Sequence, residues 1–227
     1  MTLERAESWW NRANLGGGIA MIKVVTVERE YGCGGGEIAH KLAERLRWKL
    51  WDERLTEEIA RLAECPKAIV EVREERTDPL YYRLFKSFLR GSFEGSINAH
   101  KLKLVDSESI LKLTQKVVLH AAGKGNCVIV GRGSQHFLEN KPETLRVFLY
   151  APRDEKVRRI MTRGKTELEA QRCVDTVDHE RMEFIQKYFK VEWPTRWLYH
   201  VMINTSIGEE TVIQTILDFK QMLDSRA

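Results

Sequence analysis

The sequence predicts an α/β fold, in which a parallel β-sheet is covered by helices on both faces. Short apolar runs rich in β-branched residues recur along the 227-residue chain, at 21–27, 48–52, 126–131, 145–150 and 199–206. Helical patterns separate these runs, and a glycine-rich loop lies between the first run and the helix that follows it. Buried strands that alternate with helices are typical of a parallel sheet with both faces covered. We therefore expect five parallel strands in a three-layer core.

The first strand, loop and helix form the clearest unit. The run MIKVVTV at 21–27 predicts a buried strand. After the loop, apolar residues share one helical face, at Ile38, Ala39, Leu42, Ala43 and Leu46. The run WKLWD at 48–52 predicts a second strand with Asp52 at its carboxyl end. Strand, helix and strand within about thirty residues form a βαβ unit.

The other segments are assigned by the same patterns. Residues 53–123 look mostly helical, and we interpret 66–117 as a helical insertion between the second and third strands. Two charged helices are predicted within 153–193, and one more helix closes the chain. Residues 1–20 are polar and lack the apolar core of a signal peptide, so we expect a disordered appendage before the domain at 21–227.

Composition narrows the class of function. The formal net charge of +4 suits a small anionic substrate and is too weak to indicate nucleic acid. No apolar run approaches the roughly 20 residues of a membrane helix. The four cysteines form no CxxC pair, which gives no indication of a metal site or a disulfide framework. We therefore expect a cytoplasmic protein with free thiols, a small-molecule partner and no protein-held metal.

The glycine-rich loop indicates phosphate binding. Four glycines lie at positions 32, 34, 35 and 36, directly before the helix. Backbone amides can converge on a phosphate where side chains are absent and some residues adopt positive φ. The following helix directs its partly positive amino terminus at the anion. The alternative is a tight turn that only allows the helix to pack close to the strand.

Two nucleotide-binding motifs compete at this loop, and neither fits alone. For the dinucleotide pattern GxGxxG, Gly32, Gly34 and the later acid Asp52 agree, but Glu37 occupies the third glycine position. For the Walker A pattern GxxxxGK[ST], Arg29 replaces the first glycine, Gly35 replaces the lysine and Glu37 lies near the hydroxyl position.

Longer stretches of the chain carry a family resemblance. VIVGRGS, FLYAPRDEKVRRIM and DHERMEFIQKYFKVEWPTRWLYHVMINTS resemble the cytidylate kinases in order and spacing. REYGCGG is similar to the REYGSGG loop of the cytidylate kinase-like family, and the resemblance covers about 21–65 and 118–225. It implies a P-loop NTPase-type core with a helical insertion and a helical lid at 153–193. It also implies transfer of the γ-phosphate of ATP, with Mg²⁺, to a nucleoside monophosphate or a related small acceptor.

On the donor side, the resemblance implies that ATP is bound by the loop and by the INTS segment at 203–206. These residues are Tyr31, Gly32, Cys33, Gly34, Gly35, Gly36, Glu37 and Thr205. Arg29 is the candidate to replace the missing lysine, although it can instead pair with Glu28 or Glu30 at the surface. Glu37 can cap the helix or help to hold Mg²⁺ through water. We expect it to face outward, because an inward carboxylate repels phosphate.

On the acceptor side, the resemblance implies contacts from Asp52 and Arg132. Asp52 can alternatively cap the next helix, and Arg132 can be a solvated turn residue. Among the lid arginines we expect Arg159 and Arg181 to be catalytic, together with Arg29. DER at 52–54 replaces the DSG of cytidylate kinases, so the resemblance does not imply cytosine as the base.

Two other classes of function remain open from the sequence. A P-loop fold without its lysine can serve as a nucleotide-binding or sensing module that has lost kinase activity. The GxGxxG-like spacing leaves a dinucleotide-dependent oxidoreductase as a third alternative.

Overall fold

The computed structural model describes residues 20–52, 54, 55, 58, 59 and 107–227. They form the predicted sheet, whose strands are β1 (Val24–Arg29), β2 (Lys49–Trp51), β3 (Cys127–Val130), β4 (Thr144–Tyr150) and β5 (Val201–Asn204). All neighbouring strands are parallel, in the order β2-β3-β1-β4-β5. The prediction of five parallel strands is confirmed, and the order of the strands in the sheet is not sequential. The last strand is shorter than predicted because a 3₁₀ turn, η3 (Thr205–Ile207), follows it directly.

Strand β1 lies at the centre of the sheet. It pairs with β3 on one side and β4 on the other, and Val27 is in register with both Val130 and Val147. All six residues of the strand are buried, including its last two, Glu28 and Arg29. The end of β1 therefore delivers charged side chains to the carboxyl edge of the sheet, where α/β folds bind ligands.

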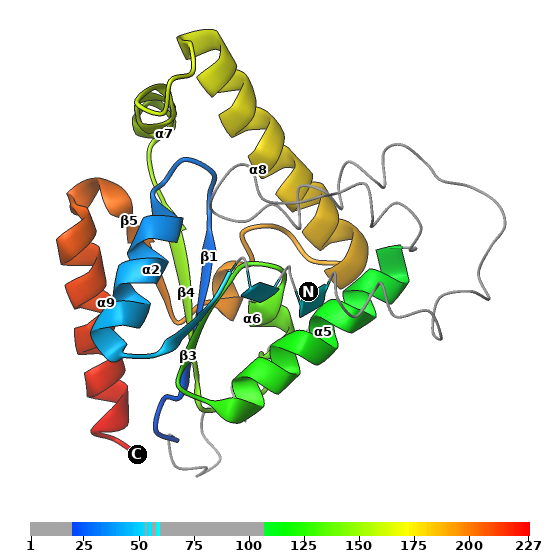
Figure 1. Cartoon of the computed structure of the whole chain (residues 1–227), viewed down its shortest axis with the longest axis vertical. Helices are drawn as coiled ribbons and strands as arrows, with labels where there is room; N and C mark the ends of the chain where they lie inside the picture. The colour runs from blue at the N-terminus through cyan, green and yellow to red at the C-terminus, as the bar shows by residue number, and fades with distance from the viewer. Residues whose placement is uncertain (1–19, 53, 56–57, 60–106) are drawn as a thin grey trace, which may run out of the picture.

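Helices α2 (Gly35–Leu46) and α9 (Glu209–Asp224) cover one face of the sheet (Figure 1). The core between them is formed by strand residues such as Val25 and Val147 and by helix residues such as Leu42 and Ile213. Leu42 and Ile213 come from the apolar faces that the sequence predicts for these two helices.

Helix α5 (Ser107–Lys124), the short helix α6 (Ser134–Phe137) and the C-terminal half of α8 (Glu167–Phe189) cover the other face. Their core includes Val118, Ile129, Leu138 and Phe184, all buried. Helices on both faces complete the predicted three-layer architecture (Figure 1).

Helix α7 (Arg153–Met161) packs against the N-terminal half of α8, beyond the carboxyl edge of the sheet (Figure 1). The pair has a small core of its own, which includes Ile160 and Val174 and also Tyr31 from the glycine loop. Thr166 caps α8 in a reciprocal hydrogen-bonded box with Glu169. The two helices predicted within 153–193 are confirmed, and their role as a lid stays a prediction.

Two predictions lie largely outside the described residues. The appendage at 1–20 falls almost entirely there, as does most of the insertion at 66–117, of which only the part in α5 is described. Among the helices that the structure describes, none is long and apolar enough to cross a membrane.

Candidate active site

The glycine loop connects the central strand to α2. Gly32 and Gly34 have φ angles of 81° and 80°, in the left-handed region that glycine adopts without strain. Gly34 is the N-cap residue of α2 and makes no side-chain cap, so the first amides of the helix remain available to a ligand. The loop therefore has the backbone geometry of a phosphate-binding site.

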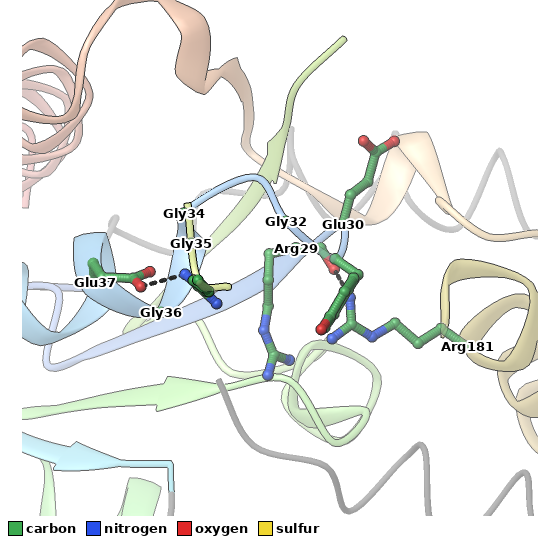
Figure 2. Close-up of a pocket in the computed structure, with 10 residues that line it drawn as sticks. Arg29, Glu30, Gly32, Gly34, Gly35, Gly36, Glu37 and Arg181 are labelled. Atoms are coloured by element: carbon green, nitrogen blue, oxygen red, sulfur yellow. Dashed lines mark hydrogen bonds and ion pairs between the residues drawn. The ribbon is translucent and has the colours of Figure 1, made fainter. Parts of the chain in front are cut away.

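A pocket that is open to solvent lies between this loop and α8 (Figure 2). Its lining includes most of the residues predicted for the donor side, and also Glu30 and Arg163, which the sequence analysis did not select. The lining residues are Arg29, Glu30, Tyr31, Gly32, Gly34, Gly35, Gly36, Glu37, Arg163 and Arg181.

Cys33, one of the residues predicted for the donor side, does not line the pocket. It lies in the core between the sheet and α2, with its Sγ 3.6 Å from the carbonyl oxygen of Leu149. Burial raises the pKa of the Cys33 thiol to about 11. The side chain is thus a buried, protonated thiol, and only the backbone of Cys33 is available to a nucleotide.

Arg29 crosses the site from the end of β1. Its stem passes over Gly35, where a Cβ atom would lie 2.8 Å from the Cβ of Arg29. Its guanidinium reaches Gly131, where a Cβ atom would lie 2.0 Å from Nη1. Two glycines thus leave the space that this side chain occupies. The guanidinium lies between the loop and the turn after β3.

The guanidinium of Arg29 is buried without full hydrogen bonding. Its Nη1 lies 3.7 Å from Oε1 of Glu28, and Nη2 has no hydrogen-bond partner among the described residues. The alternative of a surface ion pair is wrong in its location, because Arg29 is only 5% exposed. A buried donor without an acceptor is costly, so the site suits an anion.

Arg181 of α8 faces the same pocket (Figure 2). Its Nη1 donates to the carbonyl oxygen of Arg29 at 2.8 Å and lies 3.4 Å from Oδ1 of Asp178. Burial lowers the pKa of Arg181, and the nearby charge of Arg29 lowers it further. Two close, buried cations repel each other, and an anion between them would relieve this repulsion.

Asp52 and Arg132, the two predicted acceptor contacts, form a buried ion pair with each other. Arg132 Nη1 lies 2.9 Å from Oδ1 of Asp52 and also donates to the carbonyl oxygen of Val130 at 3.0 Å. Burial lowers the pKa of Arg132, although Asp52 opposes this change. Arg132 is 3% exposed, so the alternative of a solvated turn arginine is wrong.

Arg159 and Thr205 join the loop to the end of β5. Arg159 Nη1 donates to the carbonyl oxygen of Cys33 at 2.5 Å and to Oγ1 of Thr205 at 2.8 Å. Oγ1 of Thr205 donates to the same carbonyl oxygen at 2.7 Å. Neither residue lines the pocket. Arg159 thus holds the loop from outside the pocket, and its predicted catalytic role stays a prediction.

An ion-pair network that the sequence analysis missed attaches the helical pair to the loop. Lys156 Nζ lies 2.8 Å from Oε2 of Glu30 and 3.0 Å from Oδ2 of Asp178. Asp178 also accepts the backbone N–H of Tyr31 at 2.7 Å. Asp178 is not among the site residues predicted from the sequence. Its i, i+3 spacing to Arg181 on α8 is the feature that could have identified it.

Glu37 lies at the rim of the pocket. Its carboxylate pairs with Arg163 at 2.5 Å, and the two side chains are 37% and 38% exposed. Within the described part of the chain, no group of three or more His, Cys, Asp or Glu residues could hold a metal ion. The pocket nevertheless offers two carboxylates, which suits Mg²⁺, because this ion is commonly bound by one or two carboxylates together with substrate phosphates.

Comparisons with known proteins agree with this geometry. The central strand, glycine loop and following helix define a P-loop kinase fold. The sequence matches the cytidylate kinase-like family over residues 24–207, and the chain belongs to that family. Comparison with curated proteins finds no match.

Three solved structures are similar to the chain, and the first two illustrate its fold. An uncharacterized protein from Eubacterium ventriosum has a TM-score of 0.64 at 23% identity, covering 89% of this chain and 99% of the other. Shikimate kinase from Bacteroides thetaiotaomicron has a TM-score of 0.50 at 14% identity, with the same coverage. Deoxyadenosine kinase from M. mycoides has a TM-score of 0.42 at 12% identity, covering 88% and 99%. At these identities the likeness extends to the fold alone.

Proposed function

We propose that the protein is an ATP-dependent phosphotransferase that moves the γ-phosphate of ATP to a nucleoside monophosphate or a related small acceptor. The observation that supports this most strongly is the pocket at the amino terminus of α2. It combines a loop with two left-handed glycines and a buried arginine, Arg29, whose Nη2 has no hydrogen-bond partner among the described residues. Family membership supports the same class of reaction.

Phosphoryl transfer depends mainly on positioning and on stabilising charge on the transferred group. The loop amides and the helix dipole bind the donor phosphates, and Arg29 and Arg181 supply the positive charge that a loop lysine would otherwise give. Arg29 lies between the loop and the turn at Gly131, so its guanidinium can contact both the donor and the transferred phosphoryl group.

The acceptor is proposed to bind beside β3, near the Asp52–Arg132 pair, which does not line the pocket described above. The two side chains are buried and fix each other's position, so a contact with the acceptor phosphate requires that this part of the site opens when the acceptor binds. Arg159 is assigned a positioning role, because it fixes the loop to the end of β5 through Thr205. Bound Mg²⁺ would neutralise charge on the donor phosphates.

A thermal-shift screen with ATP, with and without Mg²⁺, and a panel of nucleoside monophosphates tests the proposal. Ligand at about 100 times its Kd should stabilise the protein by about 2.7 kcal/mol. Acceptors that shift the melting temperature are then assayed for ATP-dependent phosphorylation. ATP binding without turnover of any acceptor would favour the nucleotide-sensing alternative, which the glycine at position 35 also favours. A shift with NAD and none with ATP would contradict both.

A further inference from the structure

We propose that Glu37 is a metal-ligating residue that binds the Mg²⁺ of the bound ATP. When no nucleotide is bound, Arg163 pairs with Glu37 in place of the metal. The inference rests on the proposed function. It assigns a carboxylate to a task that the P-loop pattern gives to a Ser or Thr hydroxyl.

The residues that line the pocket limit which side chains could bind the Mg²⁺. Position 36, where the pattern places the hydroxyl, is a glycine, and no Ser or Thr is among the residues that line the pocket. The two carboxylates in the lining are Glu30 and Glu37. Mg²⁺ prefers oxygen ligands and keeps several waters, so one carboxylate beside the phosphates is sufficient.

The two carboxylates differ in how firmly they are held. Glu30 is bound to Lys156, whose side chain is 9% exposed and also pairs with Asp178. Glu37 pairs with Arg163 alone among the described residues, and both of these side chains are more than a third exposed. An exposed ion pair contributes little to stability and exchanges readily. Glu37 is therefore the carboxylate that can change partners.

The ATP phosphates that would accompany the metal have a binding position beside Arg29. Arg29 is 5% exposed, lines the same pocket and has no hydrogen-bond partner for Nη2 among the described residues. Glu37 lies in the first turn of α2, on the side of the loop where the helix amides begin (Figure 2). Phosphate at the loop thus lies between Arg29 and Glu37, and a dication between phosphate and Glu37 offsets their repulsion.

The exchange of partners also gives Arg163 a task. When Mg²⁺ binds Glu37, Arg163 loses its carboxylate and remains at the rim of the pocket. Because Arg163 follows α7 directly, this change couples nucleotide binding to the position of the helical pair.

The proposal is tested by measuring how strongly Mg²⁺ affects the binding of ATP. The Kd of ATP is determined by calorimetry in EDTA and in saturating MgCl₂. The Kd in EDTA divided by the Kd in MgCl₂ then reports how much the metal strengthens ATP binding. In Glu37→Gln this ratio should fall at least about fivefold, within the range common for coupled sites. In EDTA the same variant should bind ATP as tightly as the wild type or more tightly, because one negative charge is gone.

Two further variants make the result specific. Arg163→Met leaves Glu37 without its resting cation, so the ratio should rise instead of fall. Asp175→Asn, which alters an exposed ion pair on α8 away from the pocket, should keep the wild-type ratio. Electron paramagnetic resonance with Mn²⁺ gives a second readout. Mn²⁺ should bind the ATP complex of Glu37→Gln about tenfold more weakly than that of the wild type.

The outcomes separate the two proposals. ATP binding with equal ratios in the wild type and in Glu37→Gln overturns the metal role and leaves the phosphotransferase intact. A ratio that falls in both Glu37→Gln and Arg163→Met shows an ordinary structural ion pair and also overturns it. No ATP binding by the wild type in either buffer overturns the proposed function and the inference together.

Discussion

Arg29 explains why glycine occupies two positions that lie far apart in the sequence. Gly35 gives room to its stem and Gly131 to its guanidinium. Arg29 could be selected from the sequence as the candidate to replace the missing lysine of the loop. Gly131 could not be foreseen as its neighbour, because that contact joins positions about a hundred residues apart and depends on the pairing of β1 with β3.

The charge of Arg29 should matter more for turnover than for nucleotide affinity. Arg29→Ala leaves the loop amides and the helix dipole, so we expect kcat to fall about 10²- to 10³-fold while the Kd of ATP rises less than about tenfold. Arg29→Lys should retain part of the rate, since it keeps the charge without the planar fork. Steady-state kinetics and calorimetry measure both quantities. Arg153→Ala, an exposed arginine paired with Asp175, is the control, and an equal loss there would contradict the role.

A double-mutant cycle tests the contact between Arg29 and Gly131. Gly131→Ala alone should destabilise by the strain of its φ of 63°, roughly 1–2 kcal/mol, and also displace the guanidinium. In the Arg29→Ala background only the strain remains. The costs of the two substitutions, measured by urea unfolding, should therefore be non-additive by about 1 kcal/mol or more. Additive costs would show that the side chain does not occupy this space.

At the scale of elements, helices and strands were predictable because each has a local pattern. The apolar faces of α2 and α9 and the β-branched runs of β1 and β3 are visible in short windows. The contacts of the helical pair with the loop were not predictable. Lys156, Glu30 and Asp178 are charged residues that look solvated in sequence, and only the packing of α7 and α8 brings them together beneath the loop.

Asp178 should connect the stability of the helical pair to that of the loop. Asp178→Ala removes the acceptor of the Tyr31 N–H and one carboxylate of Lys156, so we expect a loss of about 1–3 kcal/mol in the free energy of unfolding and weaker ATP binding. Asp178→Asn can still accept the N–H and should lose less. Asp175→Ala, one turn earlier and exposed, should cost less than about 0.5 kcal/mol. Equal losses at both positions would remove Asp178 from this role.

For the whole molecule, buried histidines should set part of the acid sensitivity. Burial lowers the pKa of His136 and of His200 from 6.5 to about 4, and the charge of Arg146 adds to the effect at His200. Between these values the unfolded chain binds more protons than the folded one. Stability should therefore fall as pH decreases from about 7 to about 4, by up to about 3 kcal/mol for each group.

The pH dependence can be assigned to one side chain by substitution. His136 stacks on Phe189 with ring centroids 4.2 Å apart, so His136→Phe keeps an aromatic ring there and removes the titrating group. Urea unfolding of this variant should show a smaller loss of stability between pH 7 and pH 4 than the wild type. The reason is that the difference in bound protons between the unfolded and folded states sets how steeply the free energy of unfolding changes with pH. An unaltered slope in His136→Phe would contradict the assignment.

The central position of β1 has a consequence for amide hydrogen exchange. The strand is hydrogen-bonded on both sides, to β3 and to β4, and every one of its residues is buried. Its amides can exchange with deuterium only when two ladders open together, an event close to global unfolding. The helical pair, whose own apolar core is small, should exchange earlier. Among the described strands we therefore expect β1, from which the glycine loop begins, to exchange most slowly, and the helices beside the loop to exchange sooner.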